Sequence, residues 1–525
     1  DRYRVVNVQA ANLRAALASA PAEKGAGARQ SGTVISLPLP DGTSGRFRVV
    51  ETQIMHPTLA AKFPQIKTYA GQGIDDPTAV AYFDVSPAGL HTMILSPTNT
   101  VYMDPTADGV NHLVFYKRDI NHASLTRVVC GVETPTGLSQ RLAPTGSTAG
   151  SPAAIGAHGT QRRLYRLAMA CTGEYATTKG GTVAGAMAGI TASVNRVSGV
   201  YTTELSIAFQ LVANNDQLVF LNPNTDPYTN ISNGPTLNTN QTQVDNIIGT
   251  ANYDIGHVFN TDGGGVAGLG VVCRAGNKAR GTTGLPNPTG DAFDIDYVAH
   301  EIGHQFGGNH TFDSNSAGSC SGNRSNAAAY EPGSGSTIMA YANICAPENI
   351  QAYSDPYFHA KSMEEIINTI GSTGNCATLT PTNNTPPTVA AGTRRIIPKG
   401  TPFELTATGT DADGDAITYC WEQYDRTTTG GSPNAPAGDA PIFRSFLPTT
   451  NPSRTFPRLS DILANTQTTG EIMPSYGRQL HFRVTVRDNR VNGGASSYDT
   501  LSVPVVGTAG PFLVTAPNTS SVVWR

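Results

Sequence analysis

Three histidines and a glutamate stand close together in a segment that could bind a metal ion. Residues 300–310 read His-Glu-Ile-Gly-His-Gln-Phe-Gly-Gly-Asn-His. His300 and His304 are four residues apart, so on a helix they lie on one face, about one turn from each other. Gly307 can supply a sharp exit from that helix, which lets His310 return as a third nitrogen ligand. Three imidazoles with an open fourth position are typical of a catalytic zinc site.

Glu301 follows the first of these ligands directly. At that position its carboxylate is expected to accept a proton from a water molecule that the metal activates, and not to bind the metal itself. The alternative is a helix with ordinary surface histidines. The chain has only 11 His in 525 residues, which makes a chance match to this spacing rare. The segment therefore predicts zinc-dependent hydrolysis with Glu301 as general base.

A second pattern lies downstream, where residues 336–341 read Ser-Thr-Ile-Met-Ala-Tyr. Together with the helix motif, this turn resembles the metzincin metalloproteases, whose Met-turn forms a hydrophobic base beneath a three-histidine zinc site. The resemblance gives Met339 that role and implies an endopeptidase that cleaves internal peptide bonds. Tyr341 is interpreted as a movable ligand or an oxyanion stabiliser. A ring packed beside Met339 is the alternative.

Two branches of the metzincins fit different parts of the sequence. Thr311-Phe312 after the third histidine looks like the pappalysins, and reprolysin-like enzymes usually have an Asp there. Residues 165–175, 264–270 and 354–359 instead resemble a bacterial reprolysin-like (adamalysin-type) family, which we take as the working assignment. A pappalysin-like enzyme would be a selective, calcium-dependent protease. A non-catalytic adhesion or matrix-binding protein with a retained zinc site is a third reading, but such a site needs no Glu301.

A glycine-rich stretch precedes the zinc helix and could bind the substrate. An extended peptide is expected to add to this stretch as a further strand, through backbone hydrogen bonds. Glycines allow the close backbone approach that this needs, although a plain glycine-rich loop is the alternative. The residues expected to form this edge are Val266, Ala267, Gly268, Leu269 and Gly270.

The seven cysteines are an odd number, so at least one cannot form an intrachain disulfide. Cys130-Gly131-Val132-Glu133 resembles the cysteine switch of adamalysin proenzymes, in which a thiolate takes the fourth zinc position. A thiolate is a strong competitor for that place. A disulfide with Cys171 or a buried thiol is the alternative. We expect disulfides between Cys320 and Cys345 and between Cys273 and Cys376. No disulfide partner is assigned to Cys171 or Cys420.

The chain is expected to be a multidomain α+β protein. Its β-rich N-terminal part carries the cysteine switch and would act as an intramolecular inhibitor, released by a cut in a linker rich in Pro, Gly, Ser and Ala. The zinc helix is expected to begin near Asp294 or Asp296, either of which could cap it. The expected units are a prodomain (1–142), a linker (143–163), a metzincin catalytic domain (164–380), an immunoglobulin-like or cadherin-like β-sandwich (388–507) and the start of a further, truncated β module (508–525).

One acidic turn in the expected sandwich could bind a second metal. Asp411, Asp413 and Asp415 alternate with Ala412 and Gly414, and carboxylates at this spacing can bind calcium at a strand junction. A solvated acidic turn is the alternative.

The composition indicates where such a protein would act. The net charge is −4 and charged residues make up 14%, so nothing favours nucleic acid or an anionic membrane surface. No apolar run in the sequence approaches the length of about 20 residues that a membrane-spanning helix needs. Abundant Gly, Thr, Asn and Pro suit a β-rich, loop-rich extracellular protein. We expect a secreted or cell-surface protease, bacterial by its resemblance, that acts on proteins or peptides as a monomer.

Overall fold

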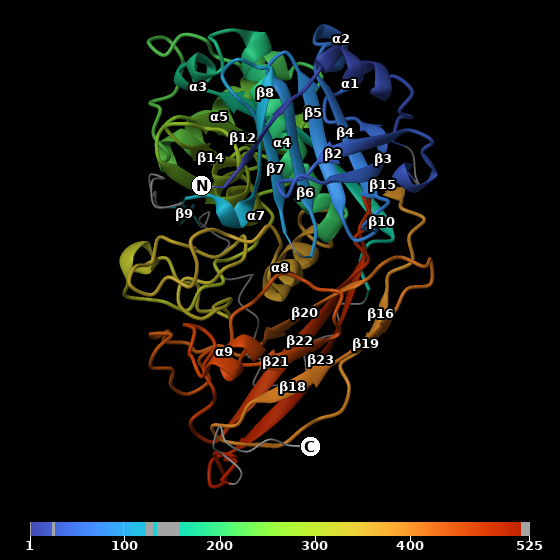
Figure 1. Ribbon diagram of the computed structural model, residues 1–525. Coiled ribbons are helices and arrows are strands. Elements are labelled where there is room, and N and C mark those ends of the chain that lie inside the picture. Colours follow the sequence, from blue (N-terminus) through green and yellow to red (C-terminus); the bar gives the residue numbers. More distant parts are fainter. Residues whose placement is uncertain (1, 24–26, 98, 122–129, 134–156, 516–525) are drawn as a thin grey trace.

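The computed structural model describes residues 2–23, 27–97, 99–121, 130–133 and 157–515. Figure 1 shows an N-terminal β region beside a central region of helices and strands, with a C-terminal β region below both. We refer to these as the N-terminal region (residues 2–133), the central region (157–381) and the C-terminal region (388–515). Helices and sheets of both kinds are present, so the expected α+β class is confirmed.

The N-terminal region is built around an antiparallel sheet, with strands in the order β1-β8-β7-β6-β5-β4-β3-β2. One face of the sheet covers a core of its own. The other face packs on the central region, where Tyr82 lies directly against Gly199. A Cβ on Gly199 would come within 2.6 Å of the Tyr82 ring. The elements are β1 (Arg4–Asn7), α1 (Ala10–Leu17), η1 (Gly27–Gln30), β2 (Val34–Pro38), β3 (Ser44–Thr52), α2 (Pro57–Lys62), β4 (Lys67–Gly73), β5 (Val80–Ser86), β6 (Gly89–Leu95), β7 (Val101–Pro105), β8 (Asn111–Tyr116) and η2 (Lys117–Asp119).

The central region contains a mixed sheet in the order β11-β10-β12-β14-β13-β9, with β15 also paired to β10. The long helix α4 is buried between this sheet and the N-terminal region. No helix among the described residues is long and apolar enough to cross a membrane. The elements are β9 (Cys130–Glu133), β10 (Gln161–Cys171), α3 (Gly173–Thr178), α4 (Val183–Leu205), β11 (Ile207–Leu211), η4 (Asn215–Leu218), α5 (Gly234–Ile247), η5 (Thr250–Asn252), β12 (Ile255–Asn260), β13 (Gly264–Gly268), β14 (Gly281–Gly284), η7 (Gly318–Cys320), α8 (Ala360–Ile370) and β15 (Thr378–Pro381).

The helix that carries the zinc motif begins earlier than expected. It runs through α6 (Asp291–Phe293), a π-helical turn η6 (Asp294–Ala299) and α7 (His300–Gln305). Gly290 precedes it without a side-chain cap, so the expected caps are wrong. Asp294 lies 3.0 Å from Arg196, and Asp296 lies 3.2 Å from Lys117. Both aspartates therefore form ion pairs with distant segments from within the helix and do not cap its start. The expected exit is confirmed, since Gly307 has a φ of +91°.

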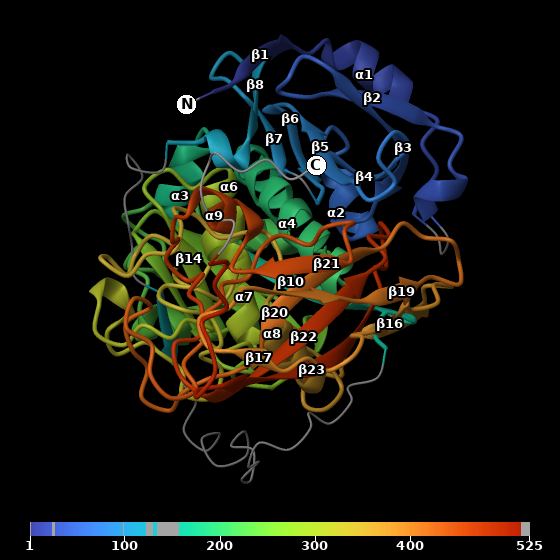
Figure 2. The ribbon, with the colours of Figure 1, turned by 60° about the horizontal axis from the view of Figure 1, so that its bottom comes forward.

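The C-terminal region has a core of its own, formed by two pairs of strands and a sheet in the order β17-β23-β22-β20. Figure 2 brings these strands to the front. Residues 508–515 contain no strand, and residues 516–525 of the expected further module lie outside the described residues. The elements are β16 (Thr388–Ala390), β17 (Ile397–Pro398), β18 (Phe403–Thr406), β19 (Thr408–Thr410), β20 (Thr418–Gln423), β21 (Ser453–Phe456), α9 (Leu459–Ala464), β22 (Arg478–Arg487) and β23 (Ser496–Val506).

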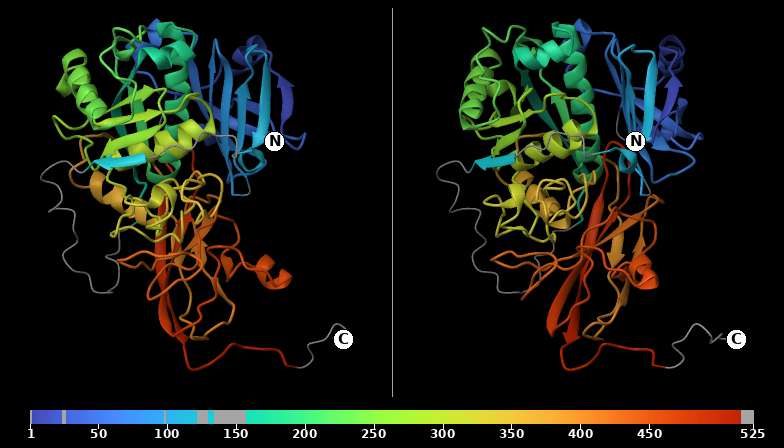
Figure 3. Two further views of the ribbon diagram at one scale, coloured as in Figure 1. Left: turned by 90° about the vertical axis from the view of Figure 1, so that its left-hand side faces the viewer. Right: turned by 60° about the vertical axis from the view of Figure 1, so that its left-hand side comes forward.

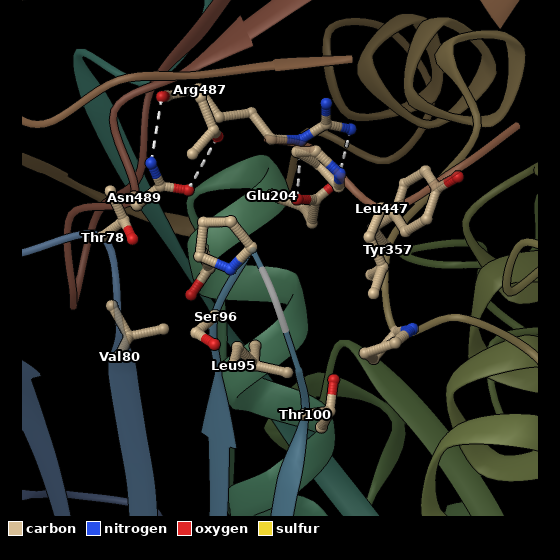
Figure 4. A pocket seen from close by; sticks show the side chains of 15 residues that line it. Thr78, Val80, Leu95, Ser96, Thr100, Glu204, Tyr357, Leu447, Arg487 and Asn489 are labelled. Carbon is tan, nitrogen blue, oxygen red and sulfur yellow. Dashed lines mark hydrogen bonds and ion pairs between the residues drawn. The ribbon is translucent and has the colours of Figure 1, made fainter. Parts of the chain in front are cut away.

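All three regions meet at a small cavity of about 50 Å³, shown in Figure 4. At its edge Arg487 of β22 donates two hydrogen bonds of 2.8 Å to the carboxylate of Glu204 on α4. Both side chains are nearly fully buried. The pair therefore joins the C-terminal region to the central helix.

Replacing Arg487 with Met is expected to destabilise the protein by about 3–5 kcal/mol, because Glu204 then keeps a buried charge with no partner. Urea unfolding monitored by circular dichroism measures this. The double variant Glu204→Gln/Arg487→Met should recover much of the loss, since no charge remains unpaired. Lys62→Met, which removes a more exposed ion pair with Asp216, should cost less than about 1 kcal/mol. If Arg487→Met destabilised the protein as little as Lys62→Met, that result would contradict the joining role of the Arg487–Glu204 pair.

Candidate active site

The three histidines of the motif converge. Nε2 of His304 lies 3.0 Å from Nε2 of both His300 and His310. Each Nδ1 lies 2.6–2.7 Å from a main-chain carbonyl oxygen, that of Ile338, Gly308 or Asn323. A carbonyl can only accept, so each Nδ1 carries the proton and each Nε2 presents a lone pair to the centre.

This arrangement fits a zinc ion. Burial lowers the pKa of His300 to about 4 and that of His310 to about 3, so the imidazoles are neutral at neutral pH, the form that binds metal. With every proton on Nδ1, the three Nε2 lone pairs repel one another unless a cation lies between them. A tetrahedral zinc ion with Zn–N bonds of about 2.0–2.1 Å brings its ligand nitrogens to about 3.3 Å from one another. The observed separations are close to that.

Glu301 lies beside this cluster and against the strand β13. It is fully buried, and a Cβ on Gly265 would come within 2.4 Å of its Cγ. Gly265 is thus the residue that lets β13 approach the carboxylate. Burial raises the pKa of Glu301 well above its usual value, and the nearby thiol of Cys130 opposes this only in part. A carboxyl group in such a place is suited to take up a proton and to return it.

Met339 lies directly beneath the zinc helix. A Cβ on Gly303 would come within 2.4 Å of the Met339 sulfur, so only glycine at that helix position admits the side chain. The carbonyl of the preceding Ile338 accepts the His300 bond described above. The main-chain carbonyl of Met339 itself accepts a bond of 3.1 Å from Thr311. The turn thus contacts both ends of the histidine cluster.

Tyr341 is packed as well as hydrogen-bonded. Its ring centre lies 4.5 Å from those of His310 and Phe312. Its hydroxyl group donates a bond of 2.5 Å to the main-chain oxygen of Cys130. In this structure the side chain therefore holds β9 in place next to the histidines.

The expected substrate edge is occupied by a segment of the N-terminal region. β13 covers Gly264–Gly268, and β9 pairs with it in parallel, Cys130 opposite Gly265 and Glu133 opposite Gly268. Figure 3 shows β9 at the free edge of the central sheet. Leu269 donates a further bond of 3.0 Å to the carbonyl of Glu133, whereas Gly270 turns away and bonds to His304. The pairing with β9 thus extends through Leu269 and does not include Gly270.

Cys130 comes to the histidine cluster by this pairing. Its sulfur, a His300 nitrogen and a Glu301 oxygen all lie within 4.8 Å of one another. Cys130 and Cys171 are both free and buried, so the alternative disulfide between them is not formed. The expected disulfides Cys320–Cys345 and Cys273–Cys376 are confirmed.

The acidic turn in the C-terminal region has a different set of neighbours from the one expected. Asp488, and not Asp413, joins Asp411 and Asp415 within 4.8 Å. Asp413 accepts a hydrogen bond of 2.6 Å from the main chain of Thr385. Two arginines face these carboxylates: Arg29 contacts Asp415, and Arg490 lies 3.5 Å from Asp413. Asp488 could not be found from the sequence, because it lies far from the turn along the chain.

Glu331 is a buried carboxylate that the sequence reasoning missed. It accepts hydrogen bonds from Thr311 (2.6 Å), Thr337 (2.5 Å) and the main chain of Ser336 (2.8 Å). These bonds join the segment after His310 to the Met-turn. Thr311 stands where reprolysin-like enzymes usually have Asp, and its hydroxyl group donates to Glu331. No spacing signal marks Glu331, since it lies in a loop of irregular sequence.

The buried three-histidine cluster of the central region could hold a metal ion such as zinc. Residues 161–369 match Metallo-peptidase family M12B Reprolysin-like. The chain therefore contains a reprolysin-like M12B metallopeptidase domain, and its histidine cluster fits a metzincin. This confirms the working assignment for that segment. No curated protein matches the chain. The disulfides found among the described residues fit an extracellular protein.

Proposed function

We propose that this chain is the latent precursor of a secreted, monomeric zinc endopeptidase, inhibited by its own N-terminal region. The observation that carries the proposal is the position of Cys130, next to His300 and Glu301, on a strand that covers the substrate edge. A prodomain and an immunoglobulin-like C-terminal domain are the proposed identities of the flanking regions. The family resemblance favours a bacterial source.

In the proposed reaction, His300, His304 and His310 would hold zinc through Nε2. When bound, zinc supplies a Lewis acid that polarises the scissile carbonyl and lowers the pKa of a water molecule. Glu301 accepts the proton of that water and passes it to the leaving amine. The main chain of β13 holds the peptide in extended form. The Tyr341 hydroxyl, once β9 has left, is available to donate to the developing oxyanion.

Latency in this proposal has a chemical part and a steric part. The thiol of Cys130 lies beside His300 and Glu301, from where it can reach the open position of a zinc ion held by the three histidines. Burial and the nearby Glu301 raise its pKa in the absence of a cation, and a zinc ion acts in the opposite sense because thiolate is the form that binds metal. The steric part is the pairing of β9 along β13, which leaves β13 with no free edge for a substrate.

Buried ion pairs hold the N-terminal region against the zinc helix. Lys117 donates to Asp291 at 2.8 Å and lies 3.2 Å from Asp296. Arg196 of α4 joins Asp104 of the N-terminal region to Asp294. These contacts support an N-terminal region that remains bound until the chain is cut.

Cleavage between the two regions tests the proposal. Residues 143–156 of the expected linker lie outside the described residues, and β10 already begins at Gln161. Arg162 pairs with Glu23 at 2.9 Å, so a protease site should be introduced before residue 157. The uncut chain should leave casein intact. Cutting and removing the N-terminal region should raise activity by roughly 100-fold or more, equivalent to the loss of about 3 kcal/mol of inhibition. Equal activity before and after the cut would contradict latency.

A further inference from the structure

The strand β9 also places a carboxylate against the central region. Glu133, the last residue of β9, extends its side chain to the guanidinium of Arg280, with which it forms an ion pair. Its main-chain carbonyl accepts the bond from Leu269. The side chain and the main chain of Glu133 are thus both held by the central region.

The surroundings of this carboxylate suit a negative charge. A Cβ on Gly234, the first residue of α5, would come within 2.0 Å of a Glu133 carboxylate oxygen. The carboxylate therefore lies beside the first residue of a 14-residue helix, near the positive end of the helix dipole, which favours anions. Arg280 adds a full positive charge at the same point, so two independent features favour an anion there.

Arg280 has little else to neutralise it. Its other guanidinium contact given by the structure is a hydrogen bond to the side-chain oxygen of Asn238, which carries no charge. The Arg280 side chain is 15% exposed. Among the described residues, removal of β9 would leave this cation without a carboxylate. A cation in that state gains from any acidic group that reaches it.

We infer that Arg280 and the start of α5 form a subsite for an acidic side chain of the substrate, so that the mature enzyme prefers peptides with Glu or Asp near the cleaved bond. The inference rests on the proposed function. Glu133 lies three residues from Cys130, or about 10 Å along an extended strand. The acidic residue should therefore stand about three residues from the scissile bond. In a peptide that binds antiparallel to β13, the acidic residue would precede the scissile bond. In a peptide that binds parallel to β13, the acidic residue would follow the scissile bond.

The test uses the mature enzyme and peptides that differ only in Glu or Gln, placed two, three or four residues before or after the cleaved bond. Glu should raise kcat/KM by about 10- to 100-fold at one of these positions, the range for a hydrogen bond to a charged group. Arg280→Gln should reduce this ratio to near one. Arg166→Gln is the control, because Arg166 of β10 forms its ion pair with Asp254. This variant should leave the ratio unchanged. The ratio is taken within one variant, so it does not depend on how much of that variant is folded.

A binding measurement makes the result independent of catalysis. The peptides Cys-Gly-Val-Glu and Cys-Gly-Val-Gln are titrated calorimetrically into the mature, zinc-loaded Glu301→Gln protein. The Glu peptide should bind about 10- to 100-fold more tightly, and Arg280→Gln should remove the difference. Equal binding of both peptides, or a Glu preference that survives Arg280→Gln, would overturn the subsite. If no peptide or casein is cleaved, the proposed function fails, but the binding difference still decides the subsite.

Discussion

Replacing Glu301 with Gln is expected to lower kcat of the mature enzyme by about 10²- to 10⁴-fold, the usual contribution of a general base. Glutamine has nearly the same shape and can fill the space against Gly265, but it cannot accept the proton of the attacking water. Steady-state cleavage of a fluorogenic peptide measures the loss. Zinc content should remain unchanged, because Glu301 is not among the three histidine ligands.

Glu404→Gln provides the matched control for this variant. Glu404 lies on β18 of the C-terminal region and is exposed, so kcat should stay near that of the parent. A Glu301→Gln enzyme with full zinc and a kcat within about tenfold of the parent would assign the proton transfer to another group.

Replacing Cys130 with Ala should make the uncut chain active. The variant loses the one free cysteine of the described residues that lies beside His300 and Glu301, so the fourth metal position should become open to water. The pairing of β9 with β13 and the ion pair of Glu133 with Arg280 remain. We therefore expect only part of the mature activity, an increase of at least about 10-fold, which corresponds to about 1.4 kcal/mol of inhibition. Cleavage of a short peptide by the intact chain measures it.

Two other free, buried cysteines serve as controls for that variant. Cys171 lies at the end of β10 and Cys420 lies on β20. Cys171→Ala and Cys420→Ala should leave the uncut chain inactive. A Cys130→Ala chain as inactive as these two, yet active after cutting, would show that pairing of β9 alone maintains latency.

The zinc site could be predicted from the sequence because its geometry is local. A spacing of four residues on one helix fixes His300 relative to His304, and Gly307 then directs His310 back to them. The resemblance to metzincins also predicted the Met-turn, and the positions of Cys320 and Cys345 on either side of the intervening loop predicted one disulfide. The other expected disulfide joins Cys273 and Cys376, which lie 103 residues apart, and no spacing indicated it.

The parts that could not be predicted depend on residues that are far apart in the sequence. Glu133 contacts Arg280, and Asp415 lies close to Asp488. No periodicity or motif in the sequence indicates either pair. The same reason explains the error at the start of the zinc helix. Asp294 looks like a helix cap by residue type, but its ion pair with Arg196 can only be seen once the helices are packed.

The mature domain is proposed to cleave peptide bonds with one zinc ion held by three histidines. The most direct test is to remove zinc from the cut and purified enzyme with a chelator and then restore it. The metal-free protein should lose cleavage of casein, and one equivalent of zinc per chain should restore it in the parent but not in Glu301→Gln. Cleavage that persists without zinc, or a parent that binds one zinc ion and still cleaves nothing after its N-terminal region is removed, would contradict the account.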